Sequence, residues 1–403
     1  MSYIPRLIEN IITETLKRGK SILLLGARQT GKTTLLKHQC QADLTYTLID
    51  AEIRLRFEKS PQALRQEILA HTHLKQLKRQ PIVILDEIQK SPDIMDMIQL
   101  IIDNHEAQFI LTGSSARKLK RNKTINLLPG RVVKIHLDPL CLLEMPKPYP
   151  DIQELLLYGT LPQIYQTPEK NLKETDLESY VSLYLNEEIR AEAVVRNLGA
   201  FARFLEFAAI ESGKQINMSK LSQDIGVNRH TITEYYQILE DCLIADRIEP
   251  ITKTTTRRRL TKSPKYLLFD MGIRRIAAGE GIQVPQKTLG ELFEQFIGLE
   301  LLRYIRLFSA MTKLRYWRDH AGPEIDYILE INHQYLPIEI KWTETPVIGD
   351  AKHLSKFMSE YDCIKPAYII CRTSKPMMLD KDIIAIPWQE LPDIIKSVFT
   401  KFK

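Results

Sequence analysis

The stretch SILLLGARQTGKTTLLKHQ, residues 21–39, decides the fold of the first part of the chain. It contains an apolar run, then a glycine-rich loop, then a helix-forming segment that begins at Lys32. A phosphate-binding loop requires this order of strand, loop and helix, because glycines let the backbone curl until its N–H groups point at the phosphates. We therefore expect an α/β domain that binds a nucleotide.

Each residue type in this loop has a role in phosphate binding. Lys32 is expected to reach the β- and γ-phosphates of ATP, and Thr33 to offer its hydroxyl to Mg²⁺. The predicted cofactors are thus ATP and Mg²⁺. The candidate nucleotide-binding residues are Gly26, Ala27, Arg28, Gln29, Thr30, Gly31, Lys32, Thr33 and Thr34.

Two acidic residues end the apolar segment PIVILDEIQ, residues 81–89. Since a buried parallel strand delivers its last side chains to the carboxyl edge of the sheet, Asp86 is expected to hold Mg²⁺ through water. Glu87 is expected to orient the attacking water, because phosphoryl transfer depends mostly on positioning and charge stabilisation. The alternative is a surface acid pair that happens to follow a strand.

Two further catalytic candidates follow along the chain. The strand in QFILTGSSARKL, residues 108–119, ends in hydroxyl residues, of which Thr112 is the preferred sensor of the γ-phosphate. Arg131, in LPGRVVKIHLDPL, could reach the γ-phosphate of a neighbouring subunit as an arginine finger. The alternative for Arg131 is a pair with a local carboxylate.

Apolar runs at regular intervals predict the first sheet. Strands are expected near residues 21–25, 46–50, 81–85, 107–112 and 132–137, with helical segments between them. Such an alternation predicts a five-stranded parallel α/β sheet.

The middle of the chain is expected to be helical. Residues 141–210 show helical apolar spacing, broken by the turn GTLP at 159–162, which we interpret as a helical lid. Residues 216–244 have the two-helix pattern of a helix-turn-helix, with Gly226 at the turn. The outward face of the second helix is a candidate DNA-reading surface, although Glu234 lies within it and protein contact is the alternative; its residues are Arg229, His230, Thr233 and Gln237.

A basic hairpin is expected next, in ADRIEPITKTTTRRRLTKSPKYLLFD, residues 245–270. Its expected tip gathers six basic residues with no acid between them: Lys253, Arg257, Arg258, Arg259, Lys262 and Lys265. Such a cluster can neutralise DNA phosphates, and the candidates for that contact are Arg257, Arg258, Arg259 and Lys262. A merely solvated loop is the alternative. The two-helix motif and this hairpin together predict a winged helix.

The last part of the chain carries a possible second metal site. An amphipathic helix, residues 291–308, contains Glu294, and GPEIDYILEINHQYLPIEIK, residues 322–341, is expected to form two strands. Residues two apart on a strand share a face, so Glu339 and Lys341 project together, and Asp326 can join them. Carboxylates beside a lysine could hold Mg²⁺.

The acidic set Glu294, Asp326 and Glu339-Ile340-Lys341 resembles the PD-(D/E)xK nuclease fold. The whole chain resembles the bacterial and archaeal AAA-type ATPases whose C-terminal domain, of unknown function, is related to those nucleases. The motifs that carry this resemblance are the loop at 26–33, LDE at 85–87, TGSS at 112–115, PGR at 129–131, YGTLP at 158–162 and FDMG at 269–272. It implies a cytoplasmic ATPase that forms a homo-oligomer, with a hexamer as one expectation, and that acts on DNA.

We therefore expect a P-loop core (1–140), a helical lid (141–210), a winged helix (211–280) and a nuclease-like α/β domain (285–403). The predicted function is an ATP-driven motor that processes branched or duplex DNA in recombination, repair or defence. A Mg²⁺-dependent nuclease and a nucleotide-switched protein scaffold are the alternatives.

Composition agrees with a folded protein of several domains. The chain has 403 residues, of which 44% are hydrophobic and 26% charged, which is ordinary for globular proteins. The formal net charge of +6 is too mild to identify a partner by itself. The five cysteines are an odd number, which argues against a disulfide framework, and no apolar run approaches the ~20 residues that span a bilayer. We expect no membrane contact.

Overall fold

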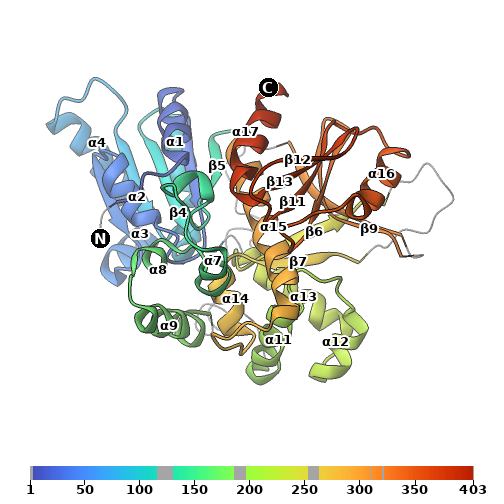
Figure 1. Ribbon diagram of the computed structural model, residues 1–403. Helices are drawn as coiled ribbons and strands as arrows, with labels where there is room; N and C mark the ends of the chain where they lie inside the picture. The colour runs from blue at the N-terminus through green and yellow to red at the C-terminus, as the bar shows by residue number, and fades with distance from the viewer. Residues whose placement is uncertain are drawn as a thin grey trace.

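The computed structural model describes residues 3–115, 130–185, 197–252, 263–309, 311–319 and 322–402. Figure 1 shows the N-terminal part in blue on the left and the C-terminal part in orange and red on the right. The green and yellow helices of the middle part lie below them.

The first sheet contains five parallel strands among the described residues, in the order β2-β3-β4-β1-β5. The prediction of a parallel α/β sheet is therefore confirmed, with strand ends shifted by a few residues. The strands are β1 (Ser21–Leu25), β2 (Leu44–Thr47), β3 (Ile82–Asp86), β4 (Gln108–Gly113) and β5 (Val132–His136).

Helices cover both faces of this sheet, which explains why its central strands carry apolar side chains on both faces. Ile22 and Leu24 of β1 pack toward one face, and Leu23 and Leu25 pack toward the other. The first face is covered by α1 (Ile8–Lys17) and α2 (Lys32–Gln39). The second face is covered by α3 (Ala51–Lys59), α4 (Pro61–Leu74) and α5 (Met95–Asp103).

The middle part begins with the short helices α7 (Ile152–Tyr158), α8 (Pro162–Gln166) and α9 (Lys170–Ser179). Three helices then share one apolar core: α11 (Leu198–Ile210), α12 (Met218–Ile225) and α13 (Arg229–Asp241). Gly226 ends α12 with φ of 79°, a left-handed conformation that favours glycine, and Asn228 caps α13. The predicted pair of helices and its turn are present, and α11, which we had assigned to the lid, packs on them.

The hairpin that follows joins the middle part to the C-terminal part. β6 (Ala245–Pro250) pairs antiparallel with β7 (Lys265–Leu268), and β6 also pairs with β8 (Lys313–Arg318). One sheet therefore runs across the boundary that we expected near residues 280–285. The basic residues Arg257, Arg258, Arg259 and Lys262, together with Lys253, lie outside the described residues.

The C-terminal part places β6 and β7 at one end of a mixed sheet with the order β12-β13-β11-β10-β9-β8-β6-β7. Its remaining strands are β9 (Glu324–Ile331), β10 (Gln334–Ile340), β11 (Ala367–Cys371), β12 (Met377–Asp380) and β13 (Ile383–Pro387). The two-residue turn Asn332-His333 between β9 and β10 has positive φ at both positions, as tight hairpins require. The helices of this part and of its junction with the middle part are α14 (Met271–Ala277), α15 (Leu289–Phe308), α16 (Lys352–Met358) and α17 (Leu391–Lys401).

Charged side chains on α15 tie the three parts of the chain together. Arg306 pairs with Asp138, which follows the first sheet, and with Asp246 of β6. Arg303 is 3% exposed and donates to the backbone oxygens of Leu140 at 2.9 Å and Phe269 at 3.2 Å. Buried ions with several such partners are costly to disturb, so the helix holds these segments in fixed relation.

None of the helices in the described ranges is long and apolar enough to cross a membrane.

Candidate functional site

The glycine-rich loop joins β1 to α2 at the carboxyl edge of the first sheet. Lys32 is 7% exposed, and its Nζ donates to the backbone oxygens of Gly26 at 2.7 Å and Ala27 at 3.0 Å, so that the lysine closes over the loop. Gly26 is needed for a close approach, because a Cβ there would lie 2.4 Å from the backbone oxygen of Leu137. Gly31 has φ of 98°, a value that favours glycine.

The first turn of α2 supplies the anion-binding character of the loop. The first N–H groups of a helix have no acceptor within the helix and carry its positive partial charge. Thr33 and Thr34 lie in this turn and both line the cavity beside the loop. The structure therefore brings the hydroxyls and the backbone donors to the same place.

The candidate catalytic residues from β3 and β4 lie at the same edge of the sheet. Thr112 Oγ1 donates to Asp86 Oδ1, and the backbone N–H of Glu87 donates to Thr112 Oγ1 at 3.2 Å. Glu87 has φ of 60°, outside the usual region for a residue with a side chain, so the end of β3 turns sharply at this position. Sparsely populated backbone conformations of this kind cluster at functional sites.

A small network orients the Glu87 carboxylate. Ser114 Oγ donates to Glu87 Oε2 at 3.1 Å, and Gln89 Nε2 donates to the same carboxylate oxygen and to Ser114 Oγ. Gln89 and Ser114 are buried, whereas Glu87 is partly exposed and lines the cavity, so the network fixes the carboxylate from its protein side. The residues that our sequence analysis assigned to catalysis on β3 and β4 therefore act on one another directly.

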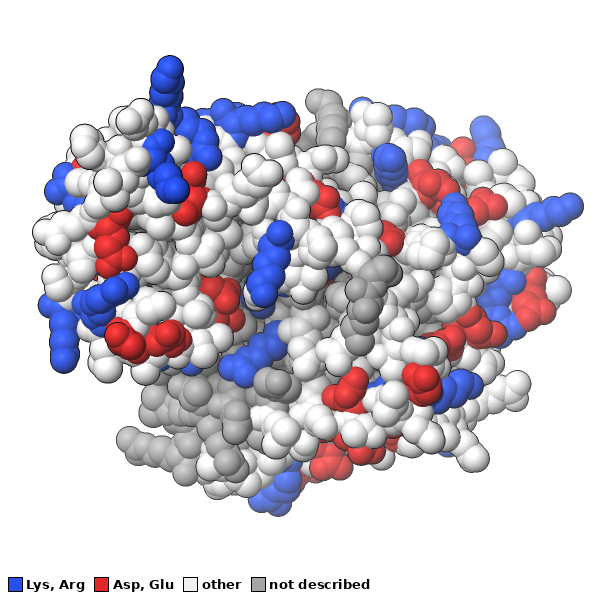
Figure 2. Space-filling view, turned by 90° about the vertical axis from the view of Figure 1, so that its left-hand side faces the viewer, with Lys and Arg blue, Asp and Glu red and all other residues white. Residues whose placement is uncertain are grey.

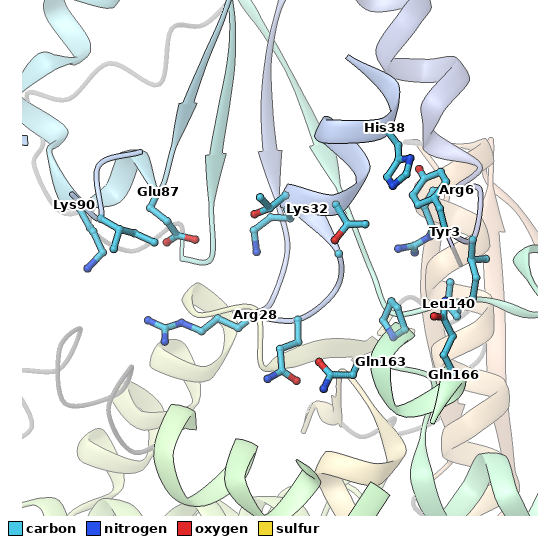
Figure 3. Close-up of a pocket in the computed structure, with 17 residues that line it drawn as sticks. Tyr3, Arg6, Arg28, Lys32, His38, Glu87, Lys90, Leu140, Gln163 and Gln166 are labelled. Atoms are coloured by element: carbon cyan, nitrogen blue, oxygen red, sulfur yellow. The ribbon is translucent and has the colours of Figure 1, made fainter. Parts of the chain in front are cut away.

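A cavity of about 620 Å³ opens beside the loop. Figure 3 shows two ends of it: Lys32, Arg28, Glu87 and Lys90 lie at one end, and Tyr3, Arg6, His38, Leu140 and Gln166 lie at the other. The first end is charged, and the second is aromatic; we call it the uncharged end because the charge of Arg6 there is paired with Glu144. This polarity fits a nucleotide whose phosphates lie at the loop and whose base lies at the far end.

The uncharged end was not predicted from the sequence. The rings of Tyr3 and His38 stack with centroids 4.2 Å apart, and Pro162, from the turn predicted at 159–162, lines the same region. Arg6 fixes the N-terminal segment there, because it donates to the backbone oxygens of Thr30 at 2.9 Å and Asp138 at 2.7 Å. The turn was a usable signal for Pro162, whereas the position of Tyr3 depends on how the segment before the first helix folds back.

The residues at the charged end fit a nucleoside triphosphate with Mg²⁺. The cavity has the size of ligand pockets, which is about 300–1,000 Å³. Its charged end combines an ammonium group and a helix N-terminus for phosphate oxygens with oxygen atoms for a hard cation. Thr33 and Asp86 would hold Mg²⁺, which neutralises phosphate charge when bound.

We predict that Tyr3→Ala weakens ATP binding about two- to tenfold, since one aromatic stacking contact contributes about 0.5–1.5 kcal/mol. Isothermal titration should show this loss for ATP and no loss for tripolyphosphate, which has no base. Tyr3→Phe is the matched control, because it keeps the ring and removes only the hydroxyl that donates to Glu9. An equal loss for tripolyphosphate would show that Tyr3 does not contact the base.

Arg131 lies away from this cavity. Its guanidinium pairs with both carboxylate oxygens of Asp103, at 2.5 Å and 2.9 Å, and its backbone precedes β5 at the amino edge of the sheet. This pair lowers the pKa of Asp103. The structure thus contains the local pair that was the alternative for Arg131, and the finger role, which needs a neighbouring subunit, stays a prediction.

The candidate DNA-reading residues of α13 share an exposed face. Arg229, His230, Thr233 and Gln237 are all exposed, while the opposite face of the helix is buried in the helical core. Glu234 is also exposed and lies 3.7 Å from His230 Nδ1, so an acid interrupts this face, as the sequence indicated.

The carboxylates of the acidic set in the C-terminal part are engaged by other groups of the chain. Glu294 pairs with Lys265 at 2.9 Å, and Glu339 pairs with Lys341 at 2.6 Å. Asp326 Oδ2 accepts from the backbone N–H of Ile340 at 2.8 Å. Within the part of the chain that the structure describes, no three His, Cys, Asp or Glu side chains could hold a metal ion together. The predicted metal site of Glu294, Asp326 and Glu339 stays a prediction, and in this structure lysines pair with two of its carboxylates.

Lys265 was predicted to belong to the basic cluster at the tip of the hairpin, and the structure corrects this prediction. The residue begins β7, is only 7% exposed and faces the C-terminal part rather than solvent. Burial raises the pKa of Glu294 to about 7, with a smaller contribution from Asp326, while Lys265 opposes this rise. Burial and the neighbouring Glu339 likewise raise the pKa of Asp326 to about 7.

The site at the glycine-rich loop lies in a segment that matches a known protein family. Residues 18–145 match the family described as AAA domain. This part of the chain is therefore similar to AAA-type P-loop ATPase domains. Residues 149–290 and 289–391 match two domains of unknown function, DUF8612 and DUF4143. The C-terminal match agrees with a domain of unknown function, and its resemblance to PD-(D/E)xK nucleases stays a prediction.

Two similar curated proteins are the uncharacterized proteins Rv2008c of Mycobacterium tuberculosis and Mb2031c of Mycobacterium bovis. Each is 25% identical over 345 residues, which cover 84% of this chain and 74% of the relative. The likeness extends well beyond the AAA domain.

One matched solved structure is Cdc6p from Pyrobaculum aerophilum, which is 12% identical to this chain at a TM-score of 0.27. The match covers 74% of this chain and 96% of that chain. VC1899 from Vibrio cholerae matches with 12% identity over 95% of this chain and 98% of its own, at a TM-score of 0.21. Scores this low carry no argument about fold or function.

Proposed function

We propose that this protein hydrolyses ATP with Mg²⁺ and uses the hydrolysis to act on DNA. The observation that carries the proposal is the cavity that brings Lys32, Thr33 and Glu87 together at the edge of a parallel sheet. A phosphoryl-transfer site needs this combination of phosphate contacts and a carboxylate near the attacking water.

The residues at the charged end have distinct roles in this proposal. Lys32 and the N-terminus of α2 bind the phosphates and stabilise negative charge as it develops. Glu87 positions and polarises the attacking water. Thr112, which donates to Asp86 and accepts from the backbone of Glu87, links the two acids and is placed to report the state of the γ-phosphate.

DNA contact is proposed for the exposed face of α13 and for the basic residues of the 253–262 segment. The three-helix core and the β6–β7 hairpin support a winged-helix interpretation, since they follow the order of that motif. Figure 2 shows the side that carries the first sheet, where basic and acidic side chains alternate among the described residues. A mixed surface of this kind does not favour DNA contact on this side of the molecule.

An oligomer is part of the proposal, because Arg131 can act as a finger only on a neighbouring subunit's nucleotide. For that role, the pair with Asp103 would have to open. Arg131→Ala in an assembled protein should then slow ATP hydrolysis while leaving ATP binding unchanged.

The DNA proposal predicts that reversing Arg257, Arg258 and Arg259 to Glu weakens binding to duplex DNA of any sequence. The slope of log affinity against log salt should fall by about 0.9 for each lost phosphate contact. Arg203→Glu is a suitable control, because Arg203 is exposed on α11. Fluorescence anisotropy with labelled duplex and junction DNA measures both quantities. Unchanged affinity in the triple variant would show that these arginines do not contact DNA.

A further inference from the structure

The carboxylates of the C-terminal part already have a cation among them, and it comes from another part of the chain. Lys265 begins β7, in the region matched by the middle domain, whereas Glu294 and Asp326 lie on α15 and β9. Its Nζ lies 2.9 Å from Glu294 Oε1. Lys265 also acts electrostatically on Asp326, because it lowers the pKa of that carboxyl.

The surroundings of the Lys265 ammonium are those of a built binding site. The rings of Tyr316 and Tyr327 have their centroids 5.1 Å and 5.8 Å from Nζ, so two aromatic rings lie near the charge. The side chain is 9% exposed. A buried lysine normally loses its proton more easily, but the acids reverse this effect and raise the pKa of Lys265.

The acidic set keeps unused acceptor and donor groups in the same region. Glu339 is 3% exposed, and its Oε2 has no hydrogen-bond partner among the described residues, although Oε1 pairs with Lys341. The hydroxyl of Tyr327 is buried and likewise without such a partner in the described ranges. A bound water or ion is one common explanation for buried polar atoms of this kind.

We propose that Lys265 is the resident cation of this acidic set. Its ammonium group, carried on β7, pairs with Glu294 at 2.9 Å and so occupies a carboxylate that a divalent cation at this set would need, and thereby keeps the C-terminal domain closed to metal. The docked hairpin thus prevents metal binding to this acidic set from within the chain. This inference does not depend on ATP hydrolysis or on DNA binding.

The test is Mn²⁺ binding to the full chain without nucleotide, measured from the signal of free Mn²⁺ in electron paramagnetic resonance. A pH near 8 is suitable, because it lies above the raised pKa values of about 7 for Glu294 and Asp326. The wild type gives the baseline. Lys265→Met should bind one more Mn²⁺ per chain, and Lys265→Arg, which keeps the positive charge, should not.

Two further variants make the result specific. Adding Asp326→Asn to Lys265→Met should remove the extra Mn²⁺, whereas Lys32→Ala in the same background should leave it in place and so excludes the nucleotide site. A folded Lys265→Met variant, verified by circular dichroism, that binds no extra Mn²⁺ would overturn the proposal.

A measurement on the wild type keeps the proposal falsifiable if Lys265→Met does not fold. Asp326→Asn in the otherwise native chain should leave Mn²⁺ binding unchanged, because Lys265 already occupies the site. If this substitution instead removes a bound Mn²⁺ from the wild type, Lys265 does not block the site and the inference is overturned.

Discussion

Lys32→Ala is expected to reduce ATP affinity by about 10²–10⁴-fold, because it removes two charge-assisted hydrogen bonds to phosphate of about 1.5–3 kcal/mol each. In the structure its ammonium group contacts the backbone of the loop, within reach of the position that the phosphates would take. Isothermal titration with a non-hydrolysable ATP analogue measures the loss directly.

Lys37→Ala is the matched control for this substitution, because Lys37 is an exposed lysine on the same helix, α2. It should bind the analogue as the wild type does. Wild-type affinity in Lys32→Ala would show that the loop does not hold phosphates and would refute the assignment of residues 26–34.

Glu87→Gln is expected to bind ATP normally and to hydrolyse it about 10²–10⁴-fold more slowly, the usual contribution of a positioned general base. The substitution keeps the size of the side chain and removes the negative charge that polarises the water. Single-turnover hydrolysis, measured beside the binding affinity, separates these two effects.

The control for Glu87→Gln is Glu58→Gln, an exposed position at the end of α3. Gln89→Ala and Ser114→Ala should have smaller effects on hydrolysis than Glu87→Gln, because they only orient its carboxylate. Normal turnover by Glu87→Gln would contradict the role given to this residue.

Local patterns predicted much of the first sheet and its loop. Residues 21–39 form the expected strand, loop and helix, because apolar strand residues, glycines at special backbone positions and a helix start all lie within one short segment. The acids at the end of β3 and Thr112 near the end of β4 were found in the same way, since parallel strands deliver their ends to one edge of the sheet. The contacts among these side chains, such as that of Ser114 with Glu87, could not be predicted from the sequence and are seen only in the structure.

Features that depend on distant segments were not predicted. Tyr3 and Arg6 line the nucleotide cavity only because the N-terminal segment folds back over the loop. Lys265 was grouped with the basic residues near it in sequence, but the pairing of β6 with β8 carries it against Glu294. The charge of a residue indicates what it can bind, whereas the sheet topology decides which residues it contacts.

The buried side chains of α15 connect the lining of the cavity beside the loop to the C-terminal part of the chain. Arg303 contacts the backbone of Leu140, and Leu140 lines the nucleotide cavity. Glu300 accepts from the backbone N–H of Leu142 at 2.9 Å. A rearrangement at the uncharged end of the cavity would therefore act directly on the helix that also carries Glu294.

The proposed ATP hydrolysis coupled to DNA is tested most directly by the rate of ATP hydrolysis by the full chain with and without DNA. Single-stranded, duplex and junction DNA should be compared at low salt, with Glu87→Gln as the inactive reference. We predict Mg²⁺-dependent hydrolysis that is strongly reduced in Glu87→Gln and is accelerated by at least one form of DNA. Hydrolysis that no DNA form changes would contradict the DNA role, and a failure to bind or hydrolyse ATP under any of these conditions would contradict the account as a whole.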